Sequence, residues 1–262
     1  MTLTDKELAQ FKRDGFLLLP GFADKEMCDT IKDIAKAHLK HKVPPIETEL
    51  EYAGKTKEER KLISDGKAHL FEGQVTVRRL RQVYHRDIVF KAWMESEEIR
   101  PILKQVLGED PTITIAHHNS IMTKMPHTST ETRWHQDFRY WSFENDNLVS
   151  VWLALDEEYS DNGVLEFIPG SHKMVFSSEQ FDEKEYFRED TPENIALAAT
   201  RTSHPLKKGD VVLFHCKLLH RANKNMTDSP KISFVYTVKG CMNRAIEGTR
   251  STAYAEIPLQ VK

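Results

Sequence analysis

Apolar residues in the first part of the chain recur at helical spacing. Thr4 and Glu7 form a capping-box pattern, which predicts a short helix through Leu8 and Phe11 that ends near Gly15. A second helix is expected to begin near Asp24, and further helices are expected over 88–93 and 99–107. The apolar positions of the second helix are expected to face the core: Met27, Ile31, Ile34 and Leu39.

Short β-rich runs separated by turns dominate the rest of the chain. Brief strands are predicted at 16–19 and 75–80. The later runs are 112–115, 148–155, 164–168, 211–214 and 232–238. Helices followed by a series of strands predict a mostly β fold with flanking α-helices, in which antiparallel strands form a double sheet such as a jelly roll.

The 262 residues fit one large domain. We expect an N-terminal helical and strand flank at 1–110, a jelly-roll core at 111–240 and a C-terminal tail at 241–262. An acidic stretch interrupts the strands and is expected to form an insertion over 173–205. Charge runs usually face water, so a solvated loop or helix is expected there, with a lid over a site as the alternative. Residues 41–73, charged and broken by prolines and glycines, predict a surface excursion or mobile flap.

Charge and composition narrow the class of partner. The 37 basic and 40 acidic residues give a formal net charge of −3, which offers no electrostatic footprint for nucleic acid or an anionic membrane. No apolar run is long enough to span a membrane and the N-terminus lacks the layout of a signal peptide, so we expect a cytoplasmic protein with small-molecule partners. Three scattered cysteines indicate neither a disulfide framework nor a zinc knuckle.

The run from Trp134 to Asp137 contains candidate metal ligands. If this run is extended, His135 and Asp137 point to the same face while Gln136 points away. His220 lies 85 residues after His135, follows the predicted strand 211–214 and could supply a third ligand. Two imidazoles and one carboxylate are the set that holds non-haem Fe(II) with positions left open for chemistry. A chance His-x-Asp tripeptide on an exposed strand is the alternative, because the chain holds 12 histidines.

Ordered motifs extend this pattern through the second half of the chain. They comprise Arg133–Asp137, Val151–Leu155, Asp161–His172, Gly209-Asp210 and His220 with Asn223. Together with Asp14-Gly15-Phe16 near the N-terminus, they closely resemble the phytanoyl-CoA dioxygenase family of Fe(II)- and 2-oxoglutarate-dependent oxygenases. The resemblance is strongest over about 110–240. It implies a double-stranded β-helix, a cupin-like jelly roll, with iron bound by His135, Asp137 and His220.

The resemblance also implies a reaction and a cosubstrate site. It implies a dioxygenase that uses O2 and 2-oxoglutarate to hydroxylate an unidentified small molecule, with release of succinate and CO2. Lys231 and Ser233 stand where the family grips the far carboxylate of the oxo acid, and period two puts both on one face of a strand with Ile232 turned away. The family usually has arginine at the position of Lys231. A guanidinium can bind both carboxylate oxygens at once, whereas the ammonium of lysine is a compact charge that cannot make this bidentate contact.

That departure leaves three consequences open. Lys231 pairs with the carboxylate through one oxygen, with Ser233 and another basic group completing the site; or the pocket prefers a different oxo acid; or catalysis has been lost. We favour the first, because a buried carboxylate needs only one close cation and hydrogen bonds.

Other candidate residues carry two interpretations each. Trp152 stands where the family places an aromatic residue near the oxo acid, but could equally belong to the core. Arg139, Tyr140 and Trp141 could line the substrate pocket, with the arginine meeting an anionic group, or could be core and rim residues. Two competing functions stay open: a non-catalytic protein of the same fold that binds a small acid, and a cupin-type enzyme that uses Zn or Mn.

Overall fold

The structure is a computed structural model that describes residues 1–53 and 76–261. Its α-helices are α1 (Asp5–Asp14), α2 (Lys25–Lys40), α3 (Glu49–Ala53), α5 (Ile88–Met94), α6 (Arg100–Leu107) and α7 (Pro192–Ala199). Its first strands are β1 (Phe16–Leu19), β2 (Ile46–Thr48), β3 (Val77–Arg81), β4 (Pro111–Ile113), β5 (Asn119–Lys124), β6 (Thr132–His135) and β7 (Leu148–Ala154). The later strands are β8 (Leu165–Phe167), β9 (Thr202–Ser203), β10 (Val211–His215), β11 (His220–Ala222), β12 (Lys231–Gly240) and β13 (Ile257–Pro258).

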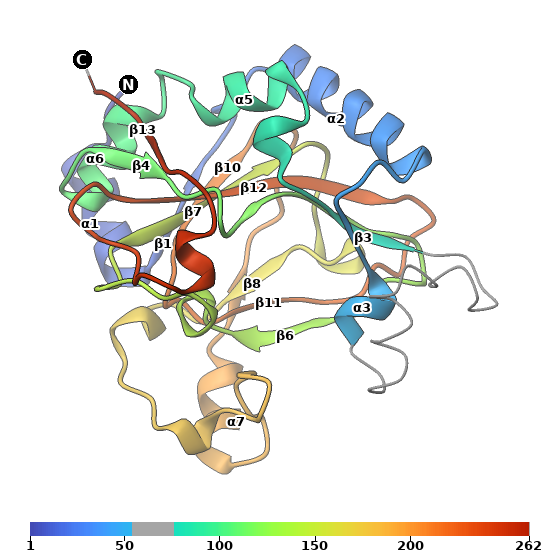
Figure 1. Ribbon diagram of the computed structural model, residues 1–262. Helices are drawn as coiled ribbons and strands as arrows, with labels where there is room; N and C mark the ends of the chain where they lie inside the picture. Colours follow the sequence, from blue (N-terminus) through green and yellow to red (C-terminus); the bar gives the residue numbers. More distant parts are fainter. Residues whose placement is uncertain (54–75, 262) are drawn as a thin grey trace.

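Two antiparallel sheets form the body of the protein. Within residues 1–53 and 76–261, the larger has nine strands in the order β1-β10-β7-β12-β5-β3-β2, with β4 on β12 and β13 on β4. The smaller has four strands in the order β6-β11-β8-β9. In Figure 1 the large sheet lies above the small one, and α2 and α5 cover its outer face. This arrangement confirms the predicted mostly β jelly roll with flanking helices.

The N-terminal elements are explained by local signals. The Thr4 hydroxyl and the Glu7 carboxylate form the expected capping box of α1, and Gly15 ends the helix at φ 83°. Asp24 caps α2 through the backbone amides of Glu26 and Met27. Between these two helices, β1 pairs with β10 and adds an edge strand to the large sheet.

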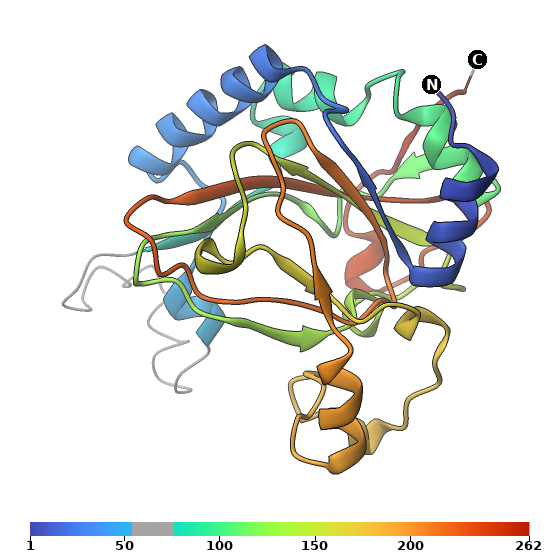
Figure 2. The ribbon, with the colours of Figure 1, turned by 180° about the vertical axis from the view of Figure 1, so that it is seen from behind.

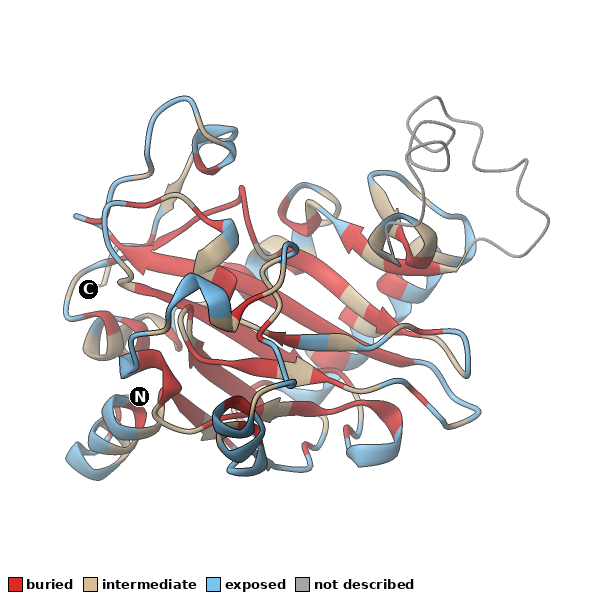
Figure 3. Ribbon diagram, turned by 90° about the horizontal axis from the view of Figure 1, so that it is seen from below, coloured by how far each residue is buried: buried red, intermediate tan, exposed pale blue. Residues whose placement is uncertain are grey.

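Alternating side chains on the large sheet divide the interior into two layers. On β12, Phe234 and Tyr236 pack under the outer helices, while Val235 packs between the sheets. The same alternation places Trp152 of β7 and Phe214 of β10 between the sheets. Figure 2 shows the same two layers from behind, and Figure 3 shows that the strands are mostly buried while the helices expose one side.

The insertion after β8 has its own small core. Phe181 and Phe187 pack with Ala198 of α7 against Trp134 and Leu219 beside the small sheet. In Figure 1 this segment, which includes α7, lies below the two sheets. The acidic stretch is therefore partly helical, as expected of a solvated insertion, and is anchored to the small sheet by aromatic residues.

The predicted excursion over 41–73 is described only at its start. β2 pairs with β3, and Thr48 and Glu49 are buried. Residues 54–73 lie outside the described residues, as does the first residue of the strand predicted at 75–80. Within the described part of the chain, every helix is too short or too polar to cross a bilayer.

Candidate metal centre

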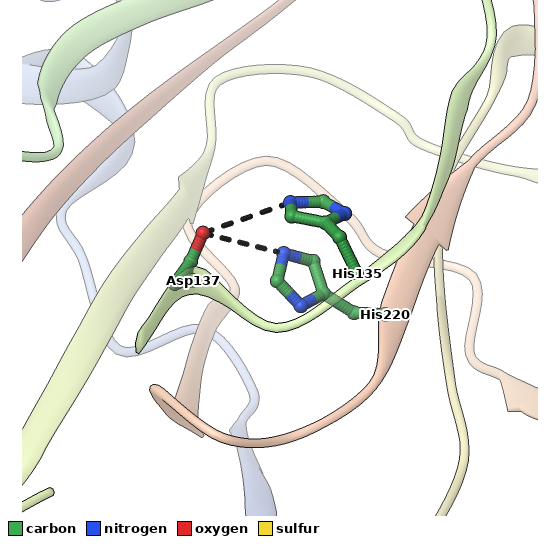
Figure 4. Close-up of side chains that lie close together, drawn as sticks. All are labelled: His135, Asp137 and His220. Carbon is green, nitrogen blue, oxygen red and sulfur yellow. Dashed lines mark ion pairs between the residues drawn. The ribbon is translucent and has the colours of Figure 1, made fainter. Parts of the chain in front are cut away.

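His135, Asp137 and His220 converge between the sheets from separate parts of the fold. One ligand atom from each lies within 4.8 Å of the other two, and the described residues contain one such group. His135 ends β6 and His220 begins β11, and the two are directly opposite each other across the strand pair. Figure 4 shows both imidazoles facing the Asp137 carboxylate. The chain therefore brings the three predicted ligands together.

The local geometry differs from the sequence-based expectation in two places. Asp137 does not continue the strand of His135: the backbone is extended through Gln136 and then enters a 3-10 turn at Asp137–Tyr140. Gln136 still points away, where its side-chain amide donates to the carbonyl of Lys217 at 2.5 Å. His220 is not at the end of β10 but opens a separate short strand, β11.

Backbone hydrogen bonds orient both imidazoles. Nδ1 of His135 lies 2.8 Å from the carbonyl of Arg133, and Nδ1 of His220 lies 3.0 Å from the carbonyl of Leu218. A carbonyl accepts only, so each Nδ1 carries the proton and each Nε2 keeps its lone pair. The two Nε2 atoms lie 3.6 Å and 3.9 Å from Oδ1 of Asp137. Two nitrogen lone pairs and a carboxylate facing one point form a donor set that fits Fe(II).

The protonation states suit metal binding at neutral pH. Burial lowers the pKa of His220 to about 3, so its ring is neutral. Burial alone would raise the pKa of Asp137, but His118, His220 and His135 outweigh it and hold the pKa well below its usual range. Metal ligands must be deprotonated, and these two groups are.

His118 adds a third imidazole beside the two of the triad. Its Nε2 lies 3.4 Å from Oδ1 of Asp137, and its Nδ1 lies 3.2 Å from the hydroxyl of Ser150. Neither its spacing nor its neighbours in the sequence pointed to it. These two contacts hold the imidazole against the carboxylate, so we expect His118 to orient Asp137.

Replacing His118 with alanine is expected to weaken Fe(II) or Mn(II) binding about 10- to 100-fold, because Asp137 loses the group that orients it. Calorimetric titration of the metal-free protein would measure this. His127→Ala is the control, since that imidazole lies at the surface against Asp228. Equal metal affinity in wild type and His118→Ala would contradict the role given to His118.

A cavity of about 250 Å³ opens from the triad. Its wall includes four of the residues predicted for cosubstrate and substrate contacts: Trp152, Lys231, Tyr140 and Trp141. Arg139, also predicted, is not part of the wall: its guanidinium lies 3.6 Å from the centre of the Phe181 ring and pairs with Glu185. Further wall residues without a sequence signal are Tyr52, Arg79, His117, His118, Lys124, Lys184, Tyr186 and Arg250.

The predicted cosubstrate donors surround an internal carboxylate that the sequence did not reveal. Lys231 Nζ lies 3.0 Å from Oε2 of Glu158, and the Ser233 hydroxyl donates to Oε1 at 2.6 Å. The indole of Trp152 donates to the same Oε1 at 3.1 Å. Side chains of Lys231 and Glu158 are 3% and 0% exposed, so Lys231 points inward but is already paired. Ile232 is turned to the outer layer as expected.

Gly163 makes this arrangement possible. It has φ 80°, and a Cβ there would collide with the backbone oxygen of Asn223 and lie 2.8 Å from Cδ of Lys124. Its carbonyl accepts a 2.7 Å hydrogen bond from Lys231. The turn at Asn162-Gly163 therefore packs against Lys124 and Lys231 of the cavity wall.

Replacing Gly163 with alanine is expected to cost about 3 kcal/mol or more of unfolding free energy, because strain at positive φ adds to a backbone collision. Chemical denaturation would measure the loss. Gly108→Ala provides the matched control, since φ is 70° there and nothing lies within 4 Å of the added Cβ. Similar losses in the two variants would show that the collision at Gly163 is relieved.

The fold and the His-Asp-His set together define a non-haem iron oxygenase of the jelly-roll class. A family model described as phytanoyl-CoA dioxygenase matches residues 11–233. The chain belongs to the phytanoyl-CoA dioxygenase family, and is therefore an Fe(II)- and 2-oxoglutarate-dependent dioxygenase. The predicted family, enzyme class and cofactors are confirmed.

Individual relatives support the same class. The ectoine dioxygenase of Streptomyces avermitilis is 24% identical over 94% of this chain and 81% of that protein. A probable alpha-ketoglutarate-dependent hypophosphite dioxygenase of Stutzerimonas stutzeri is 30% identical over 62% of this chain and 58% of that protein. The crystal structure of EctD from S. alaskensis with bound Fe aligns with a TM-score of 0.74 at 19% identity, covering 99% of this chain and 87% of that chain.

Proposed function

We propose that this dioxygenase hydroxylates a C–H bond of a small molecule that carries an anionic group. His135, Asp137 and His220 would hold the Fe(II), and 2-oxoglutarate would be converted to succinate and CO2. The observation that carries the proposal is the oriented His-Asp-His set at the wall of a cavity of about 250 Å³. When bound, the iron supplies the activation of O2 that side chains alone cannot provide.

The chain's own residues prepare the site for this chemistry. The neutral His220 and ionised Asp137 stand ready as ligands without proton release from these groups. Phe167 and Phe214 pack near the His220 ring and keep water from that side. Lys231, Ser233 and Trp152 lie on the inner face of the large sheet, where they support the cosubstrate end of the cavity.

Charge on the cavity wall favours an anionic substrate. Among the described residues, the wall holds one carboxylate, Asp137, and seven lysine or arginine residues: Arg78, Arg79, Lys124, Lys184, Arg221, Lys231 and Arg250. Four of these cations pair with carboxylates behind the wall. Lys184 and Arg250 form no ion pair with a described residue, and both are exposed. Tyr140 and Trp141 flank the remaining space and can pack on the body of the substrate.

Anaerobic titration of the Fe(II)-loaded protein with 2-oxoglutarate tests the proposal. A visible charge-transfer band is expected, followed by succinate formation when O2 is admitted. A Zn or Mn enzyme would show no such band, and a protein that only binds small acids would form no succinate. A panel of carboxylates, phosphonates, amines and neutral analogues, scored by substrate-dependent succinate, tests the anionic preference; stimulation by amines alone would reject it. The cytoplasmic location stays a prediction.

A further inference from the structure

The cavity wall contains a second buried lysine next to Lys231. Lys124 on β5 is the direct cross-strand partner of Lys231 on β12. It is 6% exposed and lines the same cavity. Burial lowers its pKa to about 7, with Lys231 and Arg78 as further causes. Placing two ammonium groups side by side in a protein interior is costly, so the arrangement calls for a physical explanation.

Each of the two lysines donates two hydrogen bonds within the protein. Lys124 Nζ donates to the carbonyls of Thr130 and Ala222, at 3.0 and 3.2 Å. Lys231 Nζ donates to the carbonyl of Gly163 and to Glu158. An ammonium has three protons, so each lysine retains one donor with no acceptor among the described residues.

Charge follows the same pattern. Glu158 compensates Lys231, whereas Lys124 forms no ion pair with any described residue. Of the three buried cations in the wall, the third, Arg78, is paired with Glu49 at 3.3 Å. When Lys124 is protonated, the group of Lys124, Lys231 and Glu158 thus carries one net positive charge, which matches one incoming carboxylate.

We propose that Lys124 and Lys231 together bind the distal carboxylate of 2-oxoglutarate, one oxygen to each ammonium, with Glu158 positioning Lys231. Two single donors from neighbouring strands then replace the two-pronged contact that one arginine makes. Glu158 is a positioning residue, because its contacts with Lys231, Ser233 and Trp152 fix the donors and it need not touch the cosubstrate. This inference rests on the proposed use of 2-oxoglutarate at this site.

The test compares two oxo acids on Mn(II)-loaded protein without O2. 2-Oxopentanoate has the same chain length as 2-oxoglutarate and the same metal-binding end, but lacks the distal carboxylate. Calorimetry is expected to show that Lys124→Met weakens 2-oxoglutarate binding about 10- to 100-fold, the effect of one charge-assisted contact. The affinity for 2-oxopentanoate is expected to stay within about threefold, because that ligand does not reach Lys124.

Two further variants serve as controls. Lys239 is also buried and also on β12, but it pairs with Glu256 outside the cavity. Lys239→Met is expected to leave the ratio of the two affinities unchanged. Lys124→Arg retains the positive charge and is expected to restore most of the preference for 2-oxoglutarate.

A pH series gives an independent readout. The groups facing Lys124 are Lys231, Arg78, Glu49 and Glu131. Because the pKa of Lys124 is lowered to about 7, its ammonium is lost as pH rises above that value. The preference of the wild type for 2-oxoglutarate over 2-oxopentanoate is therefore expected to fall above about pH 7, and to persist to higher pH in Lys124→Arg.

The outcomes separate the two proposals. Wild-type protein that binds neither oxo acid would overturn both the use of 2-oxoglutarate and the role of Lys124. Wild-type protein that prefers 2-oxoglutarate, with Lys124→Met showing the same preference, would overturn the role of Lys124 alone. Equal weakening of both ligands in Lys124→Met would also overturn it, because that result indicates a purely structural effect.

Discussion

Replacing Asp137 with alanine is expected to abolish succinate formation and to reduce metal affinity by at least about 10³-fold. Asp137 supplies the one carboxylate that the described residues bring to the cavity wall, and its Oδ1 faces His118, His135 and His220. Without it, two neutral imidazoles remain, and a hard cation such as Fe(II) loses the anionic ligand that compensates its charge. Metal content after anaerobic loading, calorimetry with Mn(II) and succinate yield would measure the two effects.

A folded protein is required for this comparison, so circular dichroism should show the wild-type spectrum. Asp156→Ala is a suitable control, because Asp156 pairs with Lys32 and is about half exposed, away from the cavity. That variant is expected to retain metal binding and turnover. Full turnover in Asp137→Ala would show that the metal is held elsewhere or that no metal is needed.

Replacing Glu158 with glutamine is expected to destabilise the cosubstrate-free protein by about 3–5 kcal/mol. The side chain is completely buried and accepts hydrogen bonds from three donors, of which Lys231 is charged. Removing one member of a buried ion pair leaves the other uncompensated, and here the second ammonium of Lys124 is adjacent. Denaturant unfolding monitored by tryptophan fluorescence would measure the loss.

The same variant is expected to gain more from 2-oxoglutarate than the wild type does, because the ligand brings a carboxylate to two lysines that have none. The rise in melting temperature on adding 2-oxoglutarate to Mn(II)-loaded protein would show this. Glu256→Gln is the matched control: it also removes the partner of a buried lysine, but Glu256 is 32% exposed and lies outside the cavity. An unfolding free energy of Glu158→Gln within about 1 kcal/mol of wild type would contradict the importance of this ion pair.

Much of the fold could be predicted because its central strands are strongly apolar. β7, β10 and β12 are buried on both faces; β7 and β10 are nearly continuous apolar runs, and β12 carries apolar residues at 232, 234–236 and 238. The strand β5 was missed because it is Asn-Ser-Ile-Met-Thr-Lys, with polar residues at most positions. Those polar residues are inward-facing or paired within the sheet, which a pattern based on hydrophobicity does not detect.

Part of the candidate site could also be predicted from the sequence, and part could not. His135, Asp137 and His220 could be predicted because the motif places them at fixed chain positions, and the structure brings them together. Glu158 could not, because it follows Asp156 and Glu157 in an acidic run that is typical of a solvated loop. Only the turn through Gly163 and the pairing of β7 with β12 bring Glu158 against Lys231. Arg139 packs on Phe181 and pairs with Glu185 because the insertion supplies these partners, and the sequence did not indicate these contacts.

The hydrogen bond from Lys124 to Ala222 joins the two sheets, because Lys124 belongs to β5 of the large sheet and Ala222 to β11 of the small one. His220 is two residues from Ala222 on the same short strand. The separation between the proposed iron ligands and the lysine pair would therefore depend on how far apart the two sheets lie at this edge. This separation would select an oxo diacid by the number of carbons between its two carboxylates. A shorter diacid such as oxaloacetate could not contact the metal and the lysine pair at the same time.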